Sequence, residues 1–123
     1  MVKKIEKAKQ ISRPDQKFLE EFVGRVNTGT AALSLAHMIA EPGWTEPFQT
    51  PEFTEVTVVV RGKLRVDFDG GSVDIGPNEV VLCEPGDRVR YSNPFDEQNE
   101  YWSVCVPAFS PDTVHRDEEI QAR

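Results

Sequence analysis

The chain has 123 residues, of which 38% are apolar and 9% aromatic, so it is long enough for one domain around a single core. Its 14 basic and 21 acidic residues give a net charge of -7, which argues against binding to a nucleic-acid backbone. No stretch approaches the roughly twenty apolar residues of a membrane span, and the first ten residues lack the apolar core of a secretory signal, so we expect a cytoplasmic protein with no membrane partner.

Residues 1–30 are expected to form an N-terminal segment that packs on the rest of the domain. Residues 1–13 are basic and fit either a short edge strand or a flexible lead. Residues 12–26 predict a short helix, because Ser12 can cap it, Pro14 suits its first turn, and apolar residues recur at helical spacing.

Short apolar segments separated by glycine- and proline-containing turns follow. Such a succession predicts an all-β sandwich or barrel over residues 31–107. Segment 80–83 is expected to be a strand that is buried on both faces. Residues 108–123 are expected to form a charged tail with a turn or helix start near Ser110. The expected strands are residues 31–40, 55–61, 64–68, 72–75, 80–83, 88–92 and 100–106.

The strand 55–61 has two different faces, because side chains alternate along a strand. Glu55 and Thr57 lie on one face, and a carboxylate and a hydroxyl in a valine-rich strand indicate that this face lines a cavity. The other face is entirely valine, at positions 56, 58 and 60. A monomer would expose this apolar face unless the N-terminal segment covers it, so we predict a homodimer joined partly through it.

The same region resembles the cupin family from Ala31 to Pro107. Glu55 and Gly62 fit the second half of the first cupin motif, and Pro85, Gly86 and Asn93 fit the second motif. The resemblance implies a double-stranded β-helix, also called a jelly-roll barrel. With the predicted N-terminal helix, this is the fold class that we expect.

The resemblance also implies a metal site, but three of its four usual ligands are absent. The two histidine positions of the first motif hold Gln49 and Pro51, and the histidine position of the second motif holds Val89. One carboxylate and one amide are poor ligands for a transition metal, so we expect a pocket without one. A divalent ion on Glu55, Gln49 and His37 remains an alternative.

A more local resemblance is to the cupin domains of the ethanolamine-utilisation Q proteins. It is carried by Thr50, Phe53, Glu55, Gly62 and Leu64. An acetate kinase activity is attributed to that group. This chain has no phosphate-binding glycine loop of its own, so we do not expect that activity here.

The candidate pocket residues combine polar groups with an apolar wall, as small-molecule sites usually do. A buried Glu55 would gain proton affinity and could act as a general acid or base, although a purely structural, hydrogen-bonded Glu55 is equally compatible with the sequence. His37 shares a face with aliphatic residues and is more often structural in such a place. The expected ligand-binding residues are Gln49, Thr57, Tyr91, His37, Glu52, Arg61 and Arg90, with Glu55 as the catalytic candidate.

Three other residues complete the sequence-based picture. Cys83 and Cys105 lie in apolar strands, which favours buried free thiols over a disulfide in a cytosolic protein. His115 lies among charged residues and is expected to be solvated or paired with an acidic neighbour.

Three functions are consistent with these patterns. The first is a metal-free cupin that binds a small polar or cationic organic molecule. The second is a cupin enzyme, similar to isomerases, lyases or the ethanolamine-utilisation Q proteins, that uses Glu55 as its acid or base. The third is an interaction module. The sequence does not identify the ligand or reaction.

Overall fold

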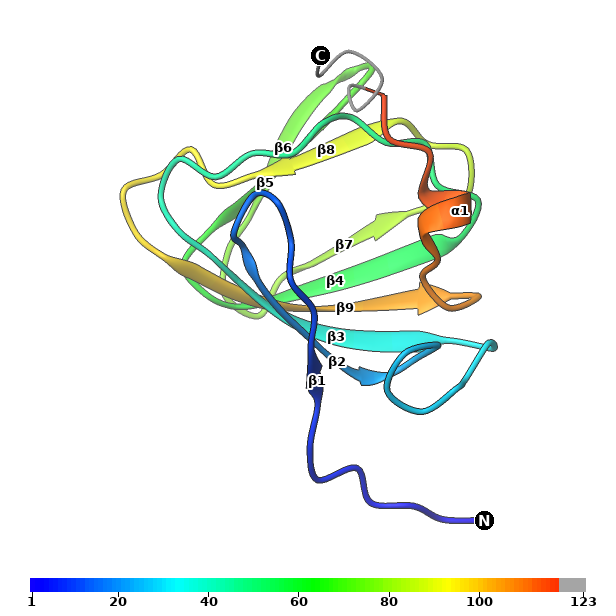
Figure 1. The fold of residues 1–123 in the computed structure, drawn as a ribbon. Coiled ribbons are helices and arrows are strands. Elements are labelled where there is room, and N and C mark those ends of the chain that lie inside the picture. Colours follow the sequence, from blue (N-terminus) through cyan, green and yellow to red (C-terminus); the bar gives the residue numbers. More distant parts are fainter. Residues whose placement is uncertain (118–123) are drawn as a thin grey trace.

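The computed structural model describes residues 1–117 and shows two antiparallel β-sheets facing each other (Figure 1). No helix in this part of the chain is long and apolar enough to cross a membrane. The elements are β1 (Lys9–Gln10), β2 (Phe18–Val23), β3 (Ser34–Ala40), β4 (Thr54–Arg61), β5 (Leu64–Phe68), β6 (Gly71–Ile75), β7 (Val80–Cys83), β8 (Val89–Ser92), β9 (Asn99–Val106) and α1 (Pro111–Val114).

The larger sheet has the strand order β1-β2-β3-β9-β4-β7, and the smaller sheet has the order β6-β5-β8. β1, β2 and β3 are consecutive in the chain, but β3, β9, β4 and β7 are brought together from distant parts of it, as in the jelly-roll, double-stranded β-helix expected from the sequence. The segment before β4 pairs with β8 only through two isolated bridges, which start from Thr45 and Gln49. Pro47 and Pro51 explain this, because proline cannot donate to a continuous ladder.

The core lies between the two sheets and is made by alternate residues of each strand. Val59, Leu64, Val66 and Tyr101 are at most 1% exposed and belong to one apolar cluster. A second, smaller cluster of Phe53, Cys105, Phe109 and Val114 lies under α1. Ser110 caps that helix by accepting a hydrogen bond from the Asp112 amide, as the tail sequence indicates.

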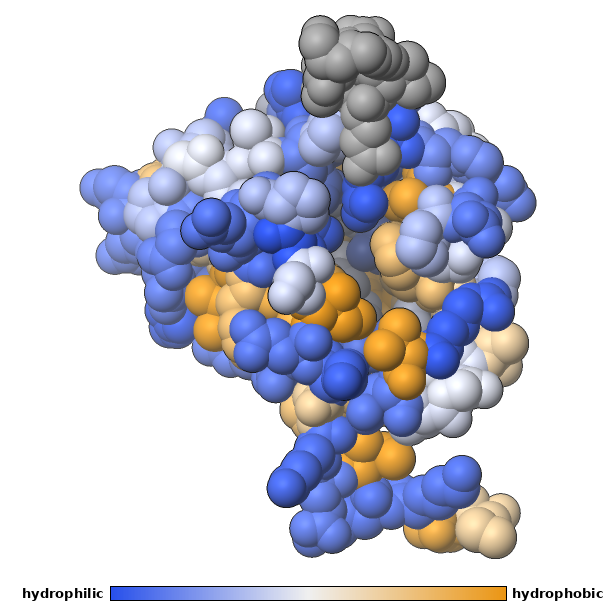
Figure 2. Space-filling view, viewed as in Figure 1, coloured by the Kyte–Doolittle hydropathy of each residue, from blue (hydrophilic) through white to orange (hydrophobic). Residues whose placement is uncertain are grey.

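The predicted helix at residues 12–26 is wrong, because its apolar half forms strand β2. β2 pairs with β3, and Phe18 lies opposite Ile39. Leu19 and Glu21 face inward, so the segment also has the two-residue period of a strand, and the hydrogen bonds of the sheet decide between the two patterns. Of the two alternatives for residues 1–13, the edge strand is present as β1. The residues before β1 project from the body (Figures 1 and 2).

The expected burial of both faces of β7 is also wrong. Val80 and Leu82 are 58% and 60% exposed, and they lie opposite Val58 and Val56 of β4. Together with Val60, which is 46% exposed, they form an apolar surface that we call the outer face of the larger sheet.

Candidate functional site

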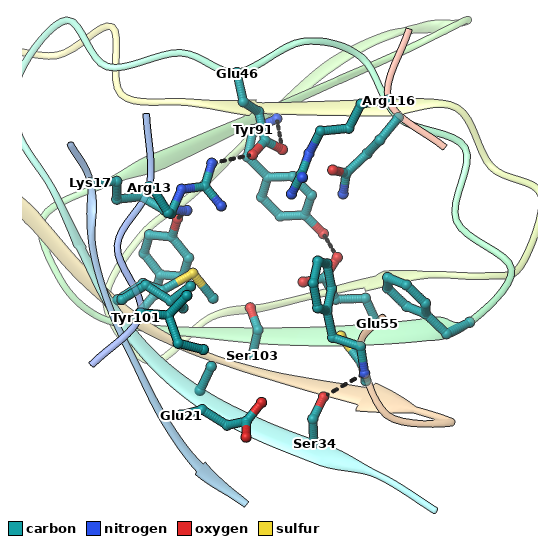
Figure 3. A pocket seen from close by; sticks show the side chains of 18 residues that line it. Arg13, Lys17, Glu21, Ser34, Glu46, Glu55, Tyr91, Tyr101, Ser103 and Arg116 are labelled. Atoms are coloured by element: carbon teal, nitrogen blue, oxygen red, sulfur yellow. Dashed lines mark hydrogen bonds and ion pairs between the residues drawn. The ribbon is translucent and has the colours of Figure 1, made fainter. Parts of the chain in front are cut away.

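A cavity of about 110 Å³ lies between the sheets, and a hollow is visible near the middle of the face shown in Figure 2. Figure 3 shows its polar side chains pointing into a shared central space. A cavity of roughly 150 Å³ can hold benzene, so this smaller volume suits an organic molecule of only a few heavy atoms. The lining residues are Ile11, Arg13, Lys17, Leu19, Glu21, Ser34, Ala36, Met38, Glu46, Gln49, Phe53, Glu55, Tyr91, Tyr101, Ser103, Cys105, Phe109 and Arg116.

Glu55 faces this cavity from β4, as the strand alternation predicted. It is 9% exposed and lies between Cys83 of β7 and Cys105 of β9 in the sheet. Burial raises the pKa of Glu55 to about 7, and repulsion from Glu46 adds to this rise, whereas a hydrogen bond from Tyr91 opposes it. Glu55 can therefore gain or lose a proton near neutral pH.

The Tyr91 hydroxyl donates to Glu55 Oε1 at 3.1 Å and lies 3.4 Å from the Cys83 sulfur. Burial raises the pKa of Tyr91 well above its ordinary value, and burial also raises the pKa of the Cys83 thiol. Both groups stay protonated at neutral pH. Cys83 and Cys105 are free and buried, which confirms the expectation for the two thiols.

Gln49 is 5% exposed, and its side-chain carbonyl oxygen has no hydrogen-bond partner. Its backbone N–H donates to the Val89 carbonyl at 2.8 Å, and its own carbonyl accepts from the Val89 N–H at 2.9 Å. The side chain is thus held at the cavity wall by a fixed backbone. A buried carbonyl without a partner costs free energy, and a ligand with a suitable donor would remove that cost.

A charged cluster borders the cavity near the start of β2. The Arg13 Nε donates to the Asp15 carboxylate at 2.9 Å, and the Arg13 guanidinium lies 3.6 Å from Glu46. Burial alone would raise the pKa of Asp15, but hydrogen bonds from Arg13 and from the Trp44 indole lower it well below its ordinary value. Asp15 is therefore charged and holds Arg13 in place at neutral pH.

The side chains around Glu55 do not fit the transition metal that the fold implies. Gln49 and Val89, which replace two of the usual histidines, contribute no imidazole, and the thiol beside Glu55 is protonated. Within residues 1–117, no group of three or more histidine, cysteine, aspartate or glutamate side chains is arranged to hold a metal ion.

Gln49, Glu55 and Tyr91 are the predicted site residues that the structure brings together in the cavity lining. Thr57 faces the same way, but it is fully buried behind the lining and hydrogen-bonds to Ser103 at 2.8 Å. Thr57 therefore does not line the cavity as predicted.

His37 does not line the cavity, so that prediction is wrong. Its ring lies on the outer side of β3, with Nδ1 2.9 Å from Glu20 and Nε2 2.7 Å from Glu100, and its ring lies beside Trp102. Met38, the next residue, points inward instead. Strand alternation alone allows either His37 or Met38 to point into the barrel. The pairing of β3 with β9 determines that Met38 does.

The remaining predicted residues also lie away from the cavity lining. Arg61 is exposed and lies 3.5 Å from Glu100, and Arg90 stacks over Phe48 while bonding to Asp67. Glu52 is exposed and pairs with His115, the acidic neighbour that the sequence allowed for this histidine.

Arg13, Lys17 and Arg116 line the cavity and were missed by the sequence reasoning. Arg13 and Lys17 fell in the segment assigned to a helix that packs on the barrel, so neither was considered for the cavity. No apolar and polar alternation marks this strand in the sequence, because Leu19 and Glu21 face inward while Glu20 and Phe22 face outward.

Comparison with known proteins gives the family and the fold. Residues 36–107 match the family model described as a cupin domain. The chain is 45% identical over 114 residues to "Endoribonuclease YbeY" of Myxococcus xanthus, covering 93% of this chain but 39% of that protein. That name therefore describes a much longer protein.

Solved structures share the fold at low sequence identity. The polyketide cyclase RemF from Streptomyces resistomycificus aligns with a TM-score of 0.74 and 15% identity, over 94% of this chain and 85% of that one. An ethanolamine utilization protein Q from Salmonella typhimurium aligns with a TM-score of 0.66 and 18% identity, over 79% and 74%. The second match agrees with the local resemblance that the sequence indicated.

Proposed function

The chain belongs to the cupin domain family, and we propose that it is a cytoplasmic member that binds a small organic molecule in its barrel without a histidine-held metal. The ligand has an apolar body and at least one hydrogen-bond donor. The buried, unpartnered carbonyl of Gln49 carries this proposal, because a barrel with a purely structural interior would leave that group costly and unused.

The rest of the lining supports the same ligand chemistry. Phe53, Phe109 and Met38 offer apolar contact, and Glu55 offers a second acceptor when it is ionised. A few polar groups on an apolar wall are typical of small-molecule sites. A neutral hydroxyl compound or a small ammonium ion would fit this combination.

The chain contains two methionines, which allow a direct binding test. Met38 lines the cavity, whereas Met1 is fully exposed at the projecting end. In protein labelled with ¹³C at the methionine methyls, titration with 1-propanol, 1,2-propanediol or propylamine should shift the Met38 signal saturably and leave Met1 unchanged.

Gln49→Leu keeps the side-chain size but removes the acceptor. It should weaken binding of the hydroxyl compounds by about five- to tenfold, the effect of losing one hydrogen bond. The exposed Glu84→Gln is the matched control and should bind as the wild type does. A Met38 signal that no probe moves would refute the binding proposal.

A second candidate function is proton transfer on a carbonyl compound, with Glu55 as acid or base. Its pKa of about 7 and its contact with Tyr91 favour this, because proton transfer works best when the pKa lies near the working pH. Incubation of hydroxyacetone in deuterated buffer, followed by NMR, would test it. Exchange of the α-hydrogens should require Glu55 and stop in Glu55→Gln.

We also propose that the protein forms a homodimer through the outer face of the larger sheet. Val60, Val80 and Leu82 are about half exposed there, and a second copy would cover them. Charge supports a second copy as the partner. Residues 1–8 carry three lysines and one glutamate and project from the body, whereas the rest of the chain has 11 basic and 20 acidic residues.

A further inference from the structure

We propose that the Lys17 amine is a reactive site for carbonyl compounds, so that the cavity takes a small aldehyde or ketone and holds it as a reversible imine. This inference rests on the proposed binding function, because it names the chemical class of ligand for the same cavity. It assigns a role to a buried nucleophile that neither candidate function above uses.

Lys17 is placed as a reactive amine rather than as a partner in an ion pair. It is 8% exposed, lines the cavity, and lies on the opposite side from Glu55 (Figure 3). Its Nζ donates to the Tyr101 hydroxyl at 2.7 Å and lies 4.0 Å from the centre of the Trp44 ring. Within residues 1–117, no carboxylate lies within ion-pair distance of Nζ.

The surroundings make the amine nucleophilic at moderate pH. The pKa of Lys17 is lowered from its ordinary value of 10.5 to about 8, mainly by burial; attraction to Glu46 opposes this shift, and the neighbouring Arg13 cation contributes a smaller lowering. The neutral amine is therefore far more abundant near pH 8 than it is for an ordinary lysine. Desolvation and a neighbouring cation are the two usual ways in which proteins activate a lysine nucleophile.

The reaction balances without any further reagent. The neutral amine attacks the carbonyl carbon, and a proton moves from nitrogen to oxygen to give a carbinolamine. The carbinolamine hydroxyl is then protonated and leaves as water while the nitrogen lone pair forms the C=N bond. Loss of a proton gives the imine, so the products are one imine and one water.

Tyr101 is placed to relay these protons. Its hydroxyl lies 2.7 Å from Nζ, and burial raises the pKa of Tyr101 well above its ordinary value, so it remains a neutral donor and acceptor. Glu46 and Glu55 raise that pKa further. Tyr101→Phe should therefore slow imine formation at Lys17 without abolishing it.

The test uses propanal with sodium cyanoborohydride, which delivers hydride to the iminium carbon and fixes the adduct as a secondary amine. Peptide mapping by mass spectrometry then identifies the modified lysine. At pH 8 we expect Lys17 to react at least about tenfold faster than the exposed Lys63, because far more of the Lys17 amine is neutral than for an ordinary lysine. The rate at Lys17 should rise with pH around a midpoint near 8.

Lys17→Arg keeps the positive charge and should remove the fast adduct, whereas Lys63→Arg should leave it unchanged. Circular dichroism of each variant checks that the fold is intact. If Lys17→Arg does not fold, the comparison of Lys17 with Lys63 in the wild-type protein, together with Tyr101→Phe, decides the question. Modification of Lys17 no faster than Lys63 would overturn the inference.

A parallel titration with 1-propanol, followed through the Met38 methyl signal, separates this inference from the binding proposal. If 1-propanol shifts the Met38 signal and Lys17 stays unmodified by propanal, the cavity binds ligands but the carbonyl inference is wrong. If neither occurs, both proposals fail. Rapid modification at Lys17 supports the inference.

Discussion

Replacing Glu55 by glutamine tests the electrostatics of the cavity directly, through the pH dependence of stability. The folded protein holds a proton on Glu55 up to a pH of about 7, whereas the unfolded chain releases it near the ordinary value of 4.5. Between these two values the folded state binds more protons, so its stability falls as pH rises. Below pH 4.5 the two states are protonated alike, and above pH 7 the full cost of a buried charge is present.

The difference between the two pKa values corresponds to about 3 kcal/mol, since one pH unit is worth about 1.4 kcal/mol. Most of this cost, roughly 2 to 3 kcal/mol, develops between pH 5 and pH 8. Glu55→Gln removes the charge but keeps an acceptor for the Tyr91 hydroxyl. The variant should therefore be more stable than the wild type at pH 8, and by much less at pH 5.

Urea denaturation followed by tryptophan fluorescence at pH 5, 6, 7 and 8 measures this difference. The stability gained by Glu55→Gln should grow steadily across the series, by roughly 2 to 3 kcal/mol in total. Glu84→Gln, at an exposed position, should show no such growth. A constant difference between Glu55→Gln and the wild type at all four pH values would mean that burial does not raise the pKa of Glu55.

Two further substitutions test the fold and the outer face. Gly62 has φ +73°, and a Cβ there would lie 2.6 Å from the Gln98 carbonyl oxygen, so Gly62→Ala should cost roughly 2 kcal/mol or more in urea denaturation. Gly43→Ala, with φ +88° but open space, should cost only about 1 kcal/mol, and equal costs would contradict the clash. Leu82→Lys should convert a dimer into a 13.9 kDa monomer in light scattering, while Val26→Lys, equally exposed at 60%, should not. A wild-type protein that is already monomeric at micromolar concentration would refute the dimer.

The sequence by itself determined the strands after residue 30 and the inward direction of Glu55. Alternating side chains and frequent turn residues are local signals, and they were sufficient to predict β3 to β9. Glu55 and Gln49 could be placed in one cavity because the cupin resemblance fixed their relative positions, and Tyr91, predicted beside them, also lines it. The buried free thiols followed from their apolar surroundings.

The tertiary structure alone decided which residues complete the cavity. Residues 18–23 fit a helix or a strand, and pairing with β3 selects the strand, which brings Lys17 and Glu21 inward. The aliphatic residues that share a face with His37 do not show whether that face points into the barrel or away from it. The pairing of β3 with β9 places this face on the outside. Side-chain pattern describes a strand's two faces, but only its hydrogen-bonded neighbours determine which face meets the core.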